Sequence, residues 1–356
     1  MPHPSERRAI TVEPGRPGSA RLDRVAPPDA SEGALLVAIE AIGICGTDRE
    51  ILSGKYGTAP PGRERLIIGH ESLGRVVEAP SDSAFATGDR VAGIVRRPDP
   101  VPCPHCAIGE WDLCSNGRYT ERGIKQRDGY AAEIVRIEPE FAVRVDASLG
   151  LAGVLTEPAS VVAKAWAEID RFAARSAANV RRRVLVTGAG PVGLLAALMG
   201  IQRGLEVTVY DRAESGAKPK LVRELGAAYR SPESQPLGDE RFDIILECTG
   251  ASPVIVEMVN RLRRDGILCL TGVSSGGHTI AIDVGGLNRE MVLDNTLVFG
   301  SVNARRAHYD AGAEALAQAD RAWLDRLISR RVPLEDWSRA FEHEPGDVKV
   351  VLDFAG

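Results

Sequence analysis

Short apolar runs separated by glycine- and proline-containing turns fill the chain up to about residue 150. The runs at residues 34–40, 75–78 and 89–95 are of this kind, and apolar residues at helical spacing are scarce among them. Such runs are typical of β-strands joined by tight turns. The pattern predicts an antiparallel, β-rich first domain, with a distorted barrel as its expected form.

The pattern changes near Leu155, where strands and helices begin to alternate. Residues 157–168 have apolar positions at helical spacing, with Pro158 at a tolerated position in the first turn. Strands are then predicted at 184–187, 207–210, 244–246, 267–270 and 297–300, and helices at 191–203, 218–225 and 254–262. Alternation of this kind predicts an α/β domain with a doubly wound parallel sheet and helices on both faces.

The tail of the chain contains a predicted helix over residues 311–330 and a final apolar strand over residues 348–354. No neighbouring segment is an obvious partner for that strand, so we expect it to return to the first domain. The predicted division is therefore a β-rich domain over residues 1–155 and 304–356, and an α/β domain over residues 156–303.

Composition and charge exclude several classes of protein. The chain has 356 residues, of which 44% are hydrophobic and 26% charged, and its net charge of −5 argues against a nucleic-acid partner. No apolar run approaches the roughly 20 residues that span a bilayer. The start, Met1–Arg8, lacks the apolar core of a secretory signal, and six cysteines in a chain of this length favour metal binding in a reducing compartment. We therefore expect a cytoplasmic protein.

A glycine-rich motif follows the predicted strand 184–187 and opens the next helix. Its glycines, Gly188, Gly190 and Gly193, permit a tight turn and a close approach to a pyrophosphate, which the N–H groups of the helix N-terminus bind. Asp211, at the end of the next strand, is placed to bond both ribose hydroxyls. The motif predicts a Rossmann-type dinucleotide site, and an ordinary glycine-rich turn with a surface aspartate is the alternative.

The residues beside Asp211 bear on the choice of cofactor. A carboxylate repels a 2′-phosphate, whereas the neighbouring Arg212 is able to accept one. We therefore expect NAD as the cofactor, with NADP tolerated. A solvated Arg212 with no role in cofactor binding is the alternative.

Three potential metal ligands stand in two short motifs. Cys45 lies in Gly-Ile-Cys-Gly-Thr-Asp at residues 43–48, and His70 and Glu71 lie in Gly-His-Glu-Ser-Leu-Gly at residues 69–74. Mixed sulfur, nitrogen and oxygen ligands suit zinc, and three protein ligands leave a position open for water or substrate. A buried cysteine beside an unrelated surface His-Glu pair is the alternative, and the dinucleotide motif favours the metal site.

A second set of cysteines, Cys103, Cys106 and Cys114, has C-x2-C-x7-C spacing within a predicted loop. Paired thiolates at this spacing favour a closed structural zinc site. Structural sites almost always have four ligands, and Asp99 and His105 are the local candidates for the fourth. A metal-free loop with partly exposed thiols is the alternative.

Together these motifs resemble those of the zinc-dependent medium-chain alcohol dehydrogenase superfamily, and within it the glucose (aldose 1-) dehydrogenase branch. The likeness covers nearly the whole chain, and residues 43–51, 68–71, 120–124 and 300–303 carry the similarity to the branch. The resemblance implies a GroES-like β-rich catalytic domain, a Rossmann domain and assembly into dimers or tetramers. It also implies oxidation of a sugar hydroxyl, at C1 of a glucose-type aldose, to a lactone.

The resemblance also implies roles for single residues. Cys45 and His70 would bind the catalytic zinc, with Glu71 bound directly or through water and Glu157 at a further metal position that also touches substrate. Thr47 would relay the substrate proton. The implied sugar contacts are Glu121, Glu157 and Asn303, and the cofactor contacts are Gly188, Gly190, Pro191, Val192, Gly193, Asp211, Arg212, Thr249, Val273 and Asn303.

Two departures from the pattern of the branch bear on the structural zinc and on the substrate. The structural lobe of the branch has four cysteines, and the first is missing here. Arg96 and Arg97 lie near a position where sugar-binding members carry an amide. A polyol, cyclitol or secondary-alcohol dehydrogenase is therefore the second prediction. A non-catalytic NAD(P)-binding protein is the third, and the ligands Cys45, His70 and Glu71 speak against it.

Overall fold

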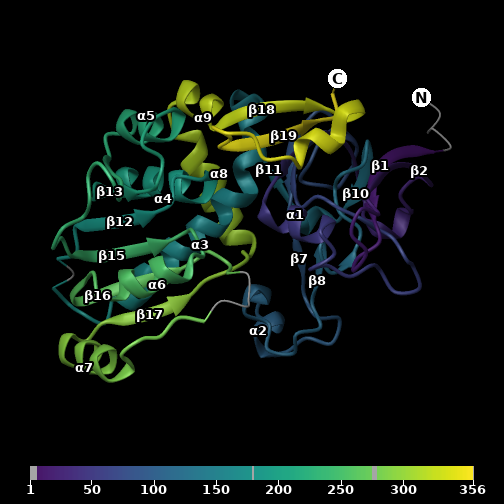
Figure 1. The fold of residues 1–356 in the computed structure, drawn as a ribbon. Helices are drawn as coiled ribbons and strands as arrows, with labels where there is room; N and C mark the ends of the chain where they lie inside the picture. The colour runs from purple at the N-terminus through teal and green to yellow at the C-terminus, as the bar shows by residue number, and fades with distance from the viewer. Residues whose placement is uncertain (1–5, 179, 275–278, 356) are drawn as a thin grey trace. The chain divides into compact units, whose positions relative to one another are not determined.

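The computed structural model describes residues 6–178, 180–274 and 279–355 of the chain. The chain divides into two compact parts, unit 1 with Met1–Ser160 and Asn303–Gly356, and unit 2 with Val161–Val302 (Figure 1). Residues 1–5, which belong to the stretch that lacks the apolar core of a secretory signal, lie outside the described residues.

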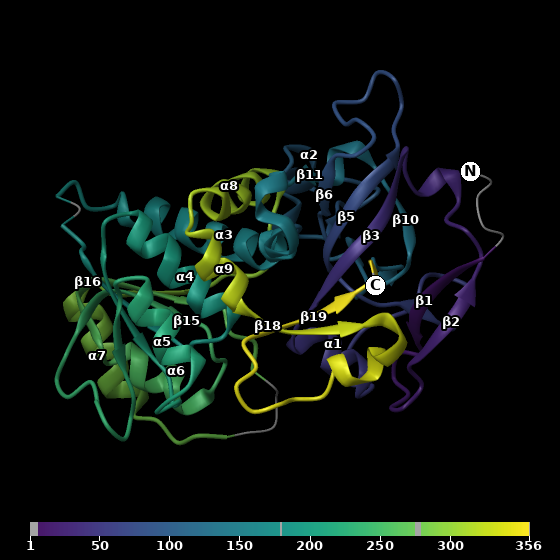
Figure 2. The same cartoon turned by 90° about the horizontal axis from the view of Figure 1, so that it is seen from above.

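Strand β3 (Leu35–Ile44) is the centre of unit 1. It pairs antiparallel with β5 (Glu71–Glu78), β10 (Ile134–Ile137) and β19 (Lys349–Asp353), so it joins segments from both ends of the chain (Figure 2). The strand order is β11-β6-β5-β3-β19-β18, and the other members are β6 (Arg90–Gly93), β11 (Ala142–Arg144) and β18 (Ile328–Pro333). Most residues of β3 are buried, as expected for a continuous apolar strand inside a core.

Shorter elements complete unit 1. Two smaller sheets contain β1 (Arg7–Val12), β2 (Arg21–Val25) and β4 (Leu66–Ile67), and β7 (Arg96–Arg97), β8 (Thr120–Arg122) and β9 (Gln126–Arg127). The helices are α1 (Gly46–Leu52), α2 (Pro104–Ala107), the start of α3 (Thr156–Ala173), α8 (Arg306–Ala317) and α9 (Arg321–Leu327). Stretches of 3-10 helix lie at Ala30–Glu32, Trp111–Leu113, Pro139–Phe141, Ala147–Leu155 and Leu334–Ala340. The predicted β-rich character of this part is confirmed.

The C-terminal tail differs from the sequence prediction in two places. The expected helix over residues 311–330 is interrupted, because α8 ends at Ala317 and α9 begins at Arg321. Asp320 is the N-cap residue of α9, and its side chain accepts the N–H of Trp323 at 2.7 Å. The last residues of the predicted helix belong instead to β18, which pairs in parallel with β19. The prediction that the final strand has no nearby partner was therefore wrong. The prediction that this strand returns to the first domain is confirmed by its pairing with β3.

The described residues of unit 2 form a six-stranded sheet in which all neighbours are parallel. The order is β14-β13-β12-β15-β16-β17, with β12 (Arg183–Thr187), β13 (Glu206–Tyr210), β14 (Ala228–Arg230), β15 (Phe242–Glu247), β16 (Leu262–Leu270) and β17 (Leu297–Gly300). The order reverses between β12 and β15, and ligands of such sheets bind at the carboxyl ends of the strands at this reversal. The predicted doubly wound sheet is confirmed, and β14 is a strand that the sequence pattern did not reveal.

Helices connect the strands of unit 2. They are the remainder of α3, α4 (Pro191–Gln202), α5 (Ala217–Glu224), α6 (Ser252–Val259) and α7 (Val284–Asp294). α4 packs on β12 and β13, and α6 on β15 and β16. α7 was not predicted, because it buries no residue and so presents no core-facing stripe in the sequence. Within the described ranges, no helix is both long enough and apolar enough to cross a membrane.

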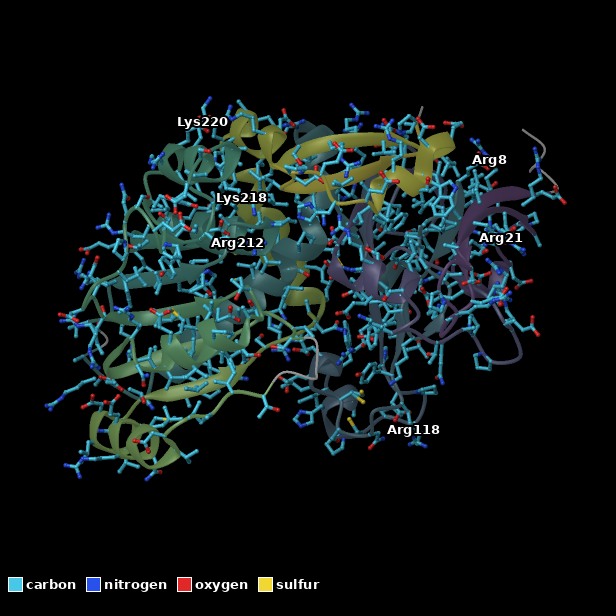
Figure 3. All side chains as sticks on the ribbon, in the orientation of Figure 1. Arg8, Arg21, Arg118, Arg212, Lys218 and Lys220 are labelled. Atoms are coloured by element: carbon cyan, nitrogen blue, oxygen red, sulfur yellow. The ribbon has the colours of Figure 1, made fainter. Side chains whose placement is uncertain are left out.

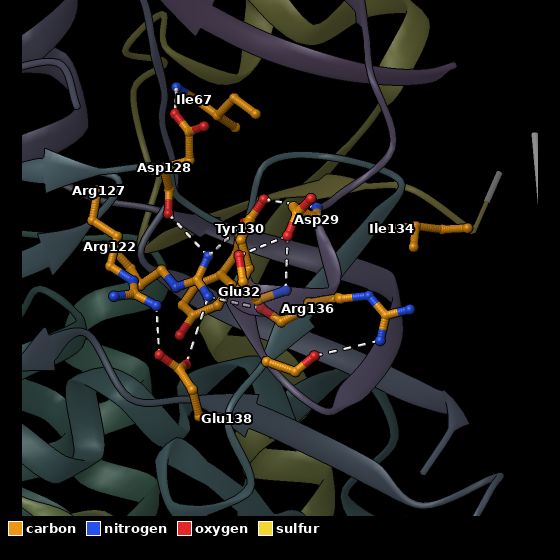
Figure 4. Close-up of polar contacts among 12 residues, drawn as sticks. Asp29, Glu32, Ile67, Arg122, Arg127, Asp128, Tyr130, Ile134, Arg136 and Glu138 are labelled. Atoms are coloured by element: carbon orange, nitrogen blue, oxygen red, sulfur yellow. Dashed lines mark hydrogen bonds and ion pairs between the residues drawn. The ribbon is translucent and has the colours of Figure 1, made fainter. Parts of the chain in front are cut away.

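Three arginines surround one carboxylate in unit 1. Arg97 donates from Nη2 and Nε to Glu138 at 2.8 and 3.2 Å, and Arg127 donates to the same carboxylate. Arg122 lies 3.7 Å from it (Figure 4). Burial opposes ionisation of Glu138, but the hydrogen bond and charge of Arg97, with the charges of Arg127 and Arg122, outweigh it and lower the pKa of Glu138 to about 2.

Replacing Glu138 by Gln should lower stability at neutral pH and flatten its dependence on acid. Because the pKa of Glu138 is lower in the folded chain than its ordinary value of 4.5, the carboxylate stabilises the fold above that value, and the contribution is lost as the pH falls toward 2. We expect E138Q to lower the free energy of unfolding at pH 7 by on the order of 3 kcal/mol, and by less at pH 3. Urea denaturation at both pH values measures this, with the exposed neighbour Glu140→Gln as control. An equal loss at both pH values would contradict the assignment.

Candidate active site

Cys45 stands at the junction of β3 and α1. β3 runs through Ile44, and Cys45 is the N-cap residue of α1. Asp48, three positions later, accepts the backbone N–H of Cys45 on its Oδ2 at 3.0 Å. This contact fixes how the strand turns into the helix, and with it the direction of the Cys45 side chain. Thr47, the expected proton relay, lies half-buried in the same first turn.

His70 is held between Cys45 and Asp48. Its Nε2 lies 3.1 Å from Sγ of Cys45, and its Nδ1 lies 3.2 Å from Oδ1 of Asp48. A carboxylate at Nδ1 favours the tautomer of the neutral ring that carries its proton there, and in that form the Nε2 lone pair is directed to the cysteine side of the ring. Since His70 and Asp48 are both buried, water does not compete for this orientation.

Two more carboxylates reach the same imidazole. Glu71 is the first residue of β5, and Glu157 lies in the first turn of α3. The ligand atoms of His70, Glu71 and Glu157 lie within 4.8 Å of one another, and so do those of Cys45, Asp48 and His70. Because His70 belongs to both sets, the structure gathers all four residues predicted for the catalytic metal around one imidazole.

Lys349 of β19 brings a positive charge to these acids. Its Nζ forms a buried ion pair with Oε2 of Glu71 and donates to the carbonyl of Ile44 at 3.1 Å. Gly43 leaves the necessary space, since a Cβ there would lie 2.2 Å from Oε2 of Glu71 and 2.8 Å from Cε of Lys349. Lys349 had no role in the sequence prediction, although a lysine inside an apolar strand is a recognisable sign of a buried charge partner.

The close charges shift the pKa values of the site. Burial lowers the pKa of His70, but the charges of Cys45 and Asp48 outweigh it and raise that pKa well above its ordinary value. Burial raises the pKa of Glu157 to about 7, with the charge of His70 opposing and that of Glu71 reinforcing the shift. Acids outnumber cations here, which is the charge pattern of a site for a divalent ion.

The residues present fit a zinc ion. Ligand atoms that bind zinc at about 2.0–2.3 Å lie within about 4.6 Å of one another, which agrees with the 4.8 Å grouping of His70 with Glu71 and Glu157 and with the 3.1 Å between Sγ of Cys45 and Nε2 of His70. A thiolate, an imidazole and carboxylates are the donor types that zinc takes in proteins. Asp48 is already engaged by His70 and by the Cys45 N–H, so it supports the imidazole from behind.

A second polar group contains two residues expected to contact sugar. Arg96 of β7 donates to Oε1 of Glu121 on β8 at 2.9 Å, and Asn303 donates to the same oxygen at 2.5 Å. The guanidinium of Arg96 also lies over the ring of Tyr119, 3.6 Å from its centroid. Among the residues described, none donates to Oε2 of Glu121. The arginine that departs from the branch pattern therefore neutralises and orients Glu121.

In unit 2 the glycine-rich motif lies between β12 and α4. Gly190 is the N-cap of α4, with Pro191 and Val192 in its first turn. Gly188 has a φ of 87°, and a Cβ on Gly193 would lie 1.9 Å from the Gly188 carbonyl oxygen, so both positions require glycine. The motif therefore has the tight turn and close helix packing that suit a pyrophosphate at a helix N-terminus.

Three other cofactor candidates follow the carboxyl ends of neighbouring strands. Asp211 follows β13, and its two carboxylate oxygens accept the N–H groups of Ala189 at 2.8 Å and Ala213 at 2.9 Å. Thr249 follows β15, and Val273, which is exposed, follows β16. Since the strands are parallel, these residues lie at one edge of the sheet with the glycine-rich motif.

The structure also brings the three cysteines of the predicted loop together. The sulfurs of Cys103, Cys106 and Cys114 lie within 4.8 Å of one another. The N–H of Cys106 donates to Sγ of Cys103 and lowers the pKa of that thiol to about 5, whereas burial raises the pKa of Cys106 to about 11. The arrangement supplies three of the four ligands that a structural zinc site takes.

Neither candidate for the fourth ligand joins these sulfurs in the described part of the chain. The carboxylate of Asp99 accepts hydrogen bonds from Asn116 at 2.8 Å and Arg118 at 3.1 Å. His105 faces Glu110, with 3.6 Å between Nδ1 and Oε2. Both side chains therefore have other partners, and the fourth ligand stays unassigned.

Two family models match the chain. The model of the alcohol dehydrogenase GroES-like domain covers residues 31–147, and that of the glucose dehydrogenase C-terminus covers residues 150–354. The second match spans more than half of the chain. The chain belongs to the glucose dehydrogenase family. Its β-rich part is the GroES-like domain of this family, and its parallel sheet is the Rossmann domain.

Relatives in the glucose dehydrogenase family match over almost the full length. Glucose 1-dehydrogenase of Methanocella arvoryzae is 37% identical over 97% of this chain and 99% of its own. Glucose 1-dehydrogenase 1 of Caldivirga maquilingensis is 39% identical over 97% of this chain and 98% of its own. Among solved structures, Haloferax mediterranei glucose dehydrogenase in complex with NADP, Zn and gluconolactone has a TM-score of 0.88 at 28% identity, covering 98% of this chain and 99% of that one.

Replacing Asp48 by Asn should weaken zinc binding without disrupting the fold. The amide keeps the shape of the side chain but loses the charge that orients His70 and makes its Nε2 a better ligand, a change that costs about 10- to 100-fold in metal affinity. Competition with a chromophoric chelator measures the zinc affinity of the metal-stripped protein. The exposed Asp82→Asn is the matched control. Unaltered zinc affinity in D48N would show that Asp48 serves the helix cap alone.

Proposed function

We propose that this protein oxidises the anomeric hydroxyl of a glucose-type aldose to the lactone, with zinc and NAD(P) as cofactors. The observation that carries the proposal is the convergence of Cys45, Glu71 and Glu157 on the imidazole of His70. The two glucose 1-dehydrogenases at 37% and 39% identity support an aldose as the substrate. The related Haloferax structure, which contains NADP, Zn and gluconolactone, supports the same reaction and both cofactors.

The residues of unit 1 would have separate roles in zinc binding and proton transfer. Cys45, His70 and Glu157 would hold zinc, with Glu71 as a direct or water-mediated ligand. When bound, zinc supplies a Lewis acid that lowers the pKa of a coordinated hydroxyl. Thr47, two residues after Cys45, would pass the substrate proton outward. The residues of unit 1 would thus orient the alcohol and take its proton, and the bound nicotinamide would supply the hydride acceptor.

Glu121 and Asn303 would recognise neighbouring sugar hydroxyls. Oε1 of Glu121 already accepts from Arg96 and Asn303, so Oε2 remains for a hydroxyl donor of the substrate. Arg96 pairs with the carboxylate and holds it in place, which prepares it to accept that bond. A buried acceptor of this kind discriminates against a deoxy sugar, because the missing hydroxyl leaves the carboxylate oxygen unpaired.

Initial rates on a panel of substrates test the proposal. Protein of known zinc content is given glucose, galactose, xylose, sorbitol and inositol, each with NAD and with NADP. We expect oxidation of aldoses in preference to sorbitol and inositol, and loss of activity with retained cofactor binding in Cys45→Ser. Activity on sorbitol or inositol but on no aldose would favour a polyol or cyclitol dehydrogenase. A zinc-free, inactive wild type would favour a binding protein.

The chain also carries residues that suit NADP. The carboxylate of Asp211 is engaged by the N–H groups of Ala189 and Ala213, while Arg212 is exposed and has no acidic partner in the described chain. Lys218 and Lys220 follow on α5, also without an ion pair among the described residues (Figure 3). We propose that Arg212 accepts the 2′-phosphate of NADP, while Asp211 retains lone pairs for the ribose hydroxyls of NAD.

Replacing Arg212 by Ala should therefore weaken NADP binding and leave NAD binding nearly unchanged. A lost charge-assisted hydrogen bond costs about 1.5–3 kcal/mol, which corresponds to a rise of roughly 10- to 100-fold in the Kd for NADP. Calorimetric titration with each cofactor measures the two values. NAD is the internal control, since it lacks only the 2′-phosphate. A similar change for both cofactors would contradict this role for Arg212.

Two further predictions concern the protein as a whole. Assembly into a homodimer or homotetramer follows from the resemblance to the superfamily, in which both are known. A cytoplasmic location follows from the composition and from the six cysteines, which favour metal binding in a reducing compartment. Both stay predictions.

A further inference from the structure

Glu247 lies where the strand order of unit 2 reverses. It is the last residue of β15, is fully buried, and pairs in the sheet with Thr187, the last residue of β12. The glycine-rich motif begins at the next residue, Gly188. Because dinucleotides bind at this reversal, a carboxylate buried here lies at the crevice that the cofactor would occupy.

The carboxylate of Glu247 is held by hydrogen-bond donors and not by a cation. Oε1 accepts the N–H of Thr249 at 2.7 Å, the hydroxyl of Thr187 at 3.2 Å and the hydroxyl of Thr249. Oε2 accepts the N–H of Gly250 at 3.1 Å. Both oxygens act as acceptors, as those of an ionised carboxylate do. Across the ranges that the structure describes, no Lys, Arg or His forms an ion pair with Glu247, so its charge is not cancelled by a neighbour.

Glu247 also fixes the loop after β16. Its backbone carbonyl accepts the N–H groups of Thr271 at 2.9 Å and Gly272 at 3.0 Å. A Cβ on Gly272 would lie 2.1 Å from the nitrogen of Gly250 and 2.9 Å from Oε2 of Glu247. The ends of β12, β15 and β16 therefore pack tightly around one negative charge that has little freedom to move.

We propose that the negative charge of Glu247 favours binding of the oxidised nicotinamide cofactor over binding of the reduced form. The inference rests on the proposed function. Asp211 assigns the adenosine half to β13, which leaves the nicotinamide half for the side of β15 and β16. The oxidised ring carries a positive charge, and the reduced ring carries none. A fixed, poorly screened negative charge attracts only the oxidised ring, while all other contacts of the two forms are shared.

Replacing Glu247 by Gln separates this role from simple loop anchoring. The variant keeps the size of the side chain and one acceptor oxygen but removes the charge. We expect the ratio of the Kd for NADPH to the Kd for NADP to fall on the order of tenfold, the size of one charge interaction in a partly screened site. Calorimetry and the fluorescence of the reduced nicotinamide measure the two constants on zinc-loaded protein, and thermal unfolding of the ligand-free protein reports its fold.

Two controls accompany E247Q. Thr249→Val removes one donor to the carboxylate and keeps the charge, so it should weaken both cofactor forms equally and leave the ratio unchanged. Glu257→Gln removes the same formal charge from α6, where Glu257 pairs with Arg261 at 2.9 Å, and should also leave the ratio unchanged. If E247Q weakens both forms by the same factor, Glu247 anchors the loops only and the proposal is overturned.

A second pair of variants keeps the proposal testable if E247Q does not fold. Glu247→Asp and Glu247→Asn are of equal size and differ in charge alone. The Kd ratio should be lower in E247N than in E247D. An equal ratio in the two variants would overturn the proposal. Failure of the wild type to bind either NADP or NADPH would instead contradict the proposed function.

Discussion

The pairing of β3 with β5 is the constraint on which the candidate site depends. Its register places Gly43 opposite Glu71, so the residue before β5, His70, comes to lie beside Cys45 at the end of β3. A shift of one residue would turn the side chains of either strand to the opposite face. Gly43 protects this register locally, because a larger residue would collide with the ion pair between Glu71 and Lys349. The backbone pairing of β3 with β5 therefore sets the relative positions of Cys45, His70 and Glu71.

Buried charge is the second theme of unit 1. Burying an isolated carboxylate is costly, and a charge partner with good geometry offsets most of that cost. The chain supplies such partners from distant segments: Lys349 for Glu71, Arg96 for Glu121, and Arg97 with Arg127 for Glu138. At Glu121 the partners occupy only one carboxylate oxygen, which leaves the other for a ligand. The same ion pairs that stabilise the fold therefore also prepare polar groups for recognition.

How far the sequence predicts this site depends on the distance over which each contact acts. Cys45, His70 and Glu71 were predicted as ligands because their residue types are those of zinc ligands, and the parallel sheet was predicted because its strands and helices alternate locally. Glu157 was named only by the resemblance, since nothing local connects it to His70. Asp48 and Lys349 were missed for a similar reason: an aspartate early in a helix predicts a cap equally well, and one lysine in a strand does not reveal its partner. The prediction of a helix over residues 311–330 was wrong at its end, because these residues form β18 and pair with β19. This pairing is a tertiary effect that local periodicity does not reveal.

The two units treat buried carboxylates in opposite ways, and the difference follows from what each is proposed to bind. In unit 1, Glu71 and Glu121 have cationic partners in the chain itself. In unit 2, the partners of the Glu247 carboxylate within the described part of the chain are N–H and O–H donors. Such donors keep a carboxylate ionised without cancelling its long-range field. A buried carboxylate without a cationic partner does not stabilise the ligand-free protein. Glu247 at the strand-order reversal is therefore explained by a ligand that brings the opposite charge. The oxidised nicotinamide is such a ligand, and losing that charge is the chemical change that the hydride brings about.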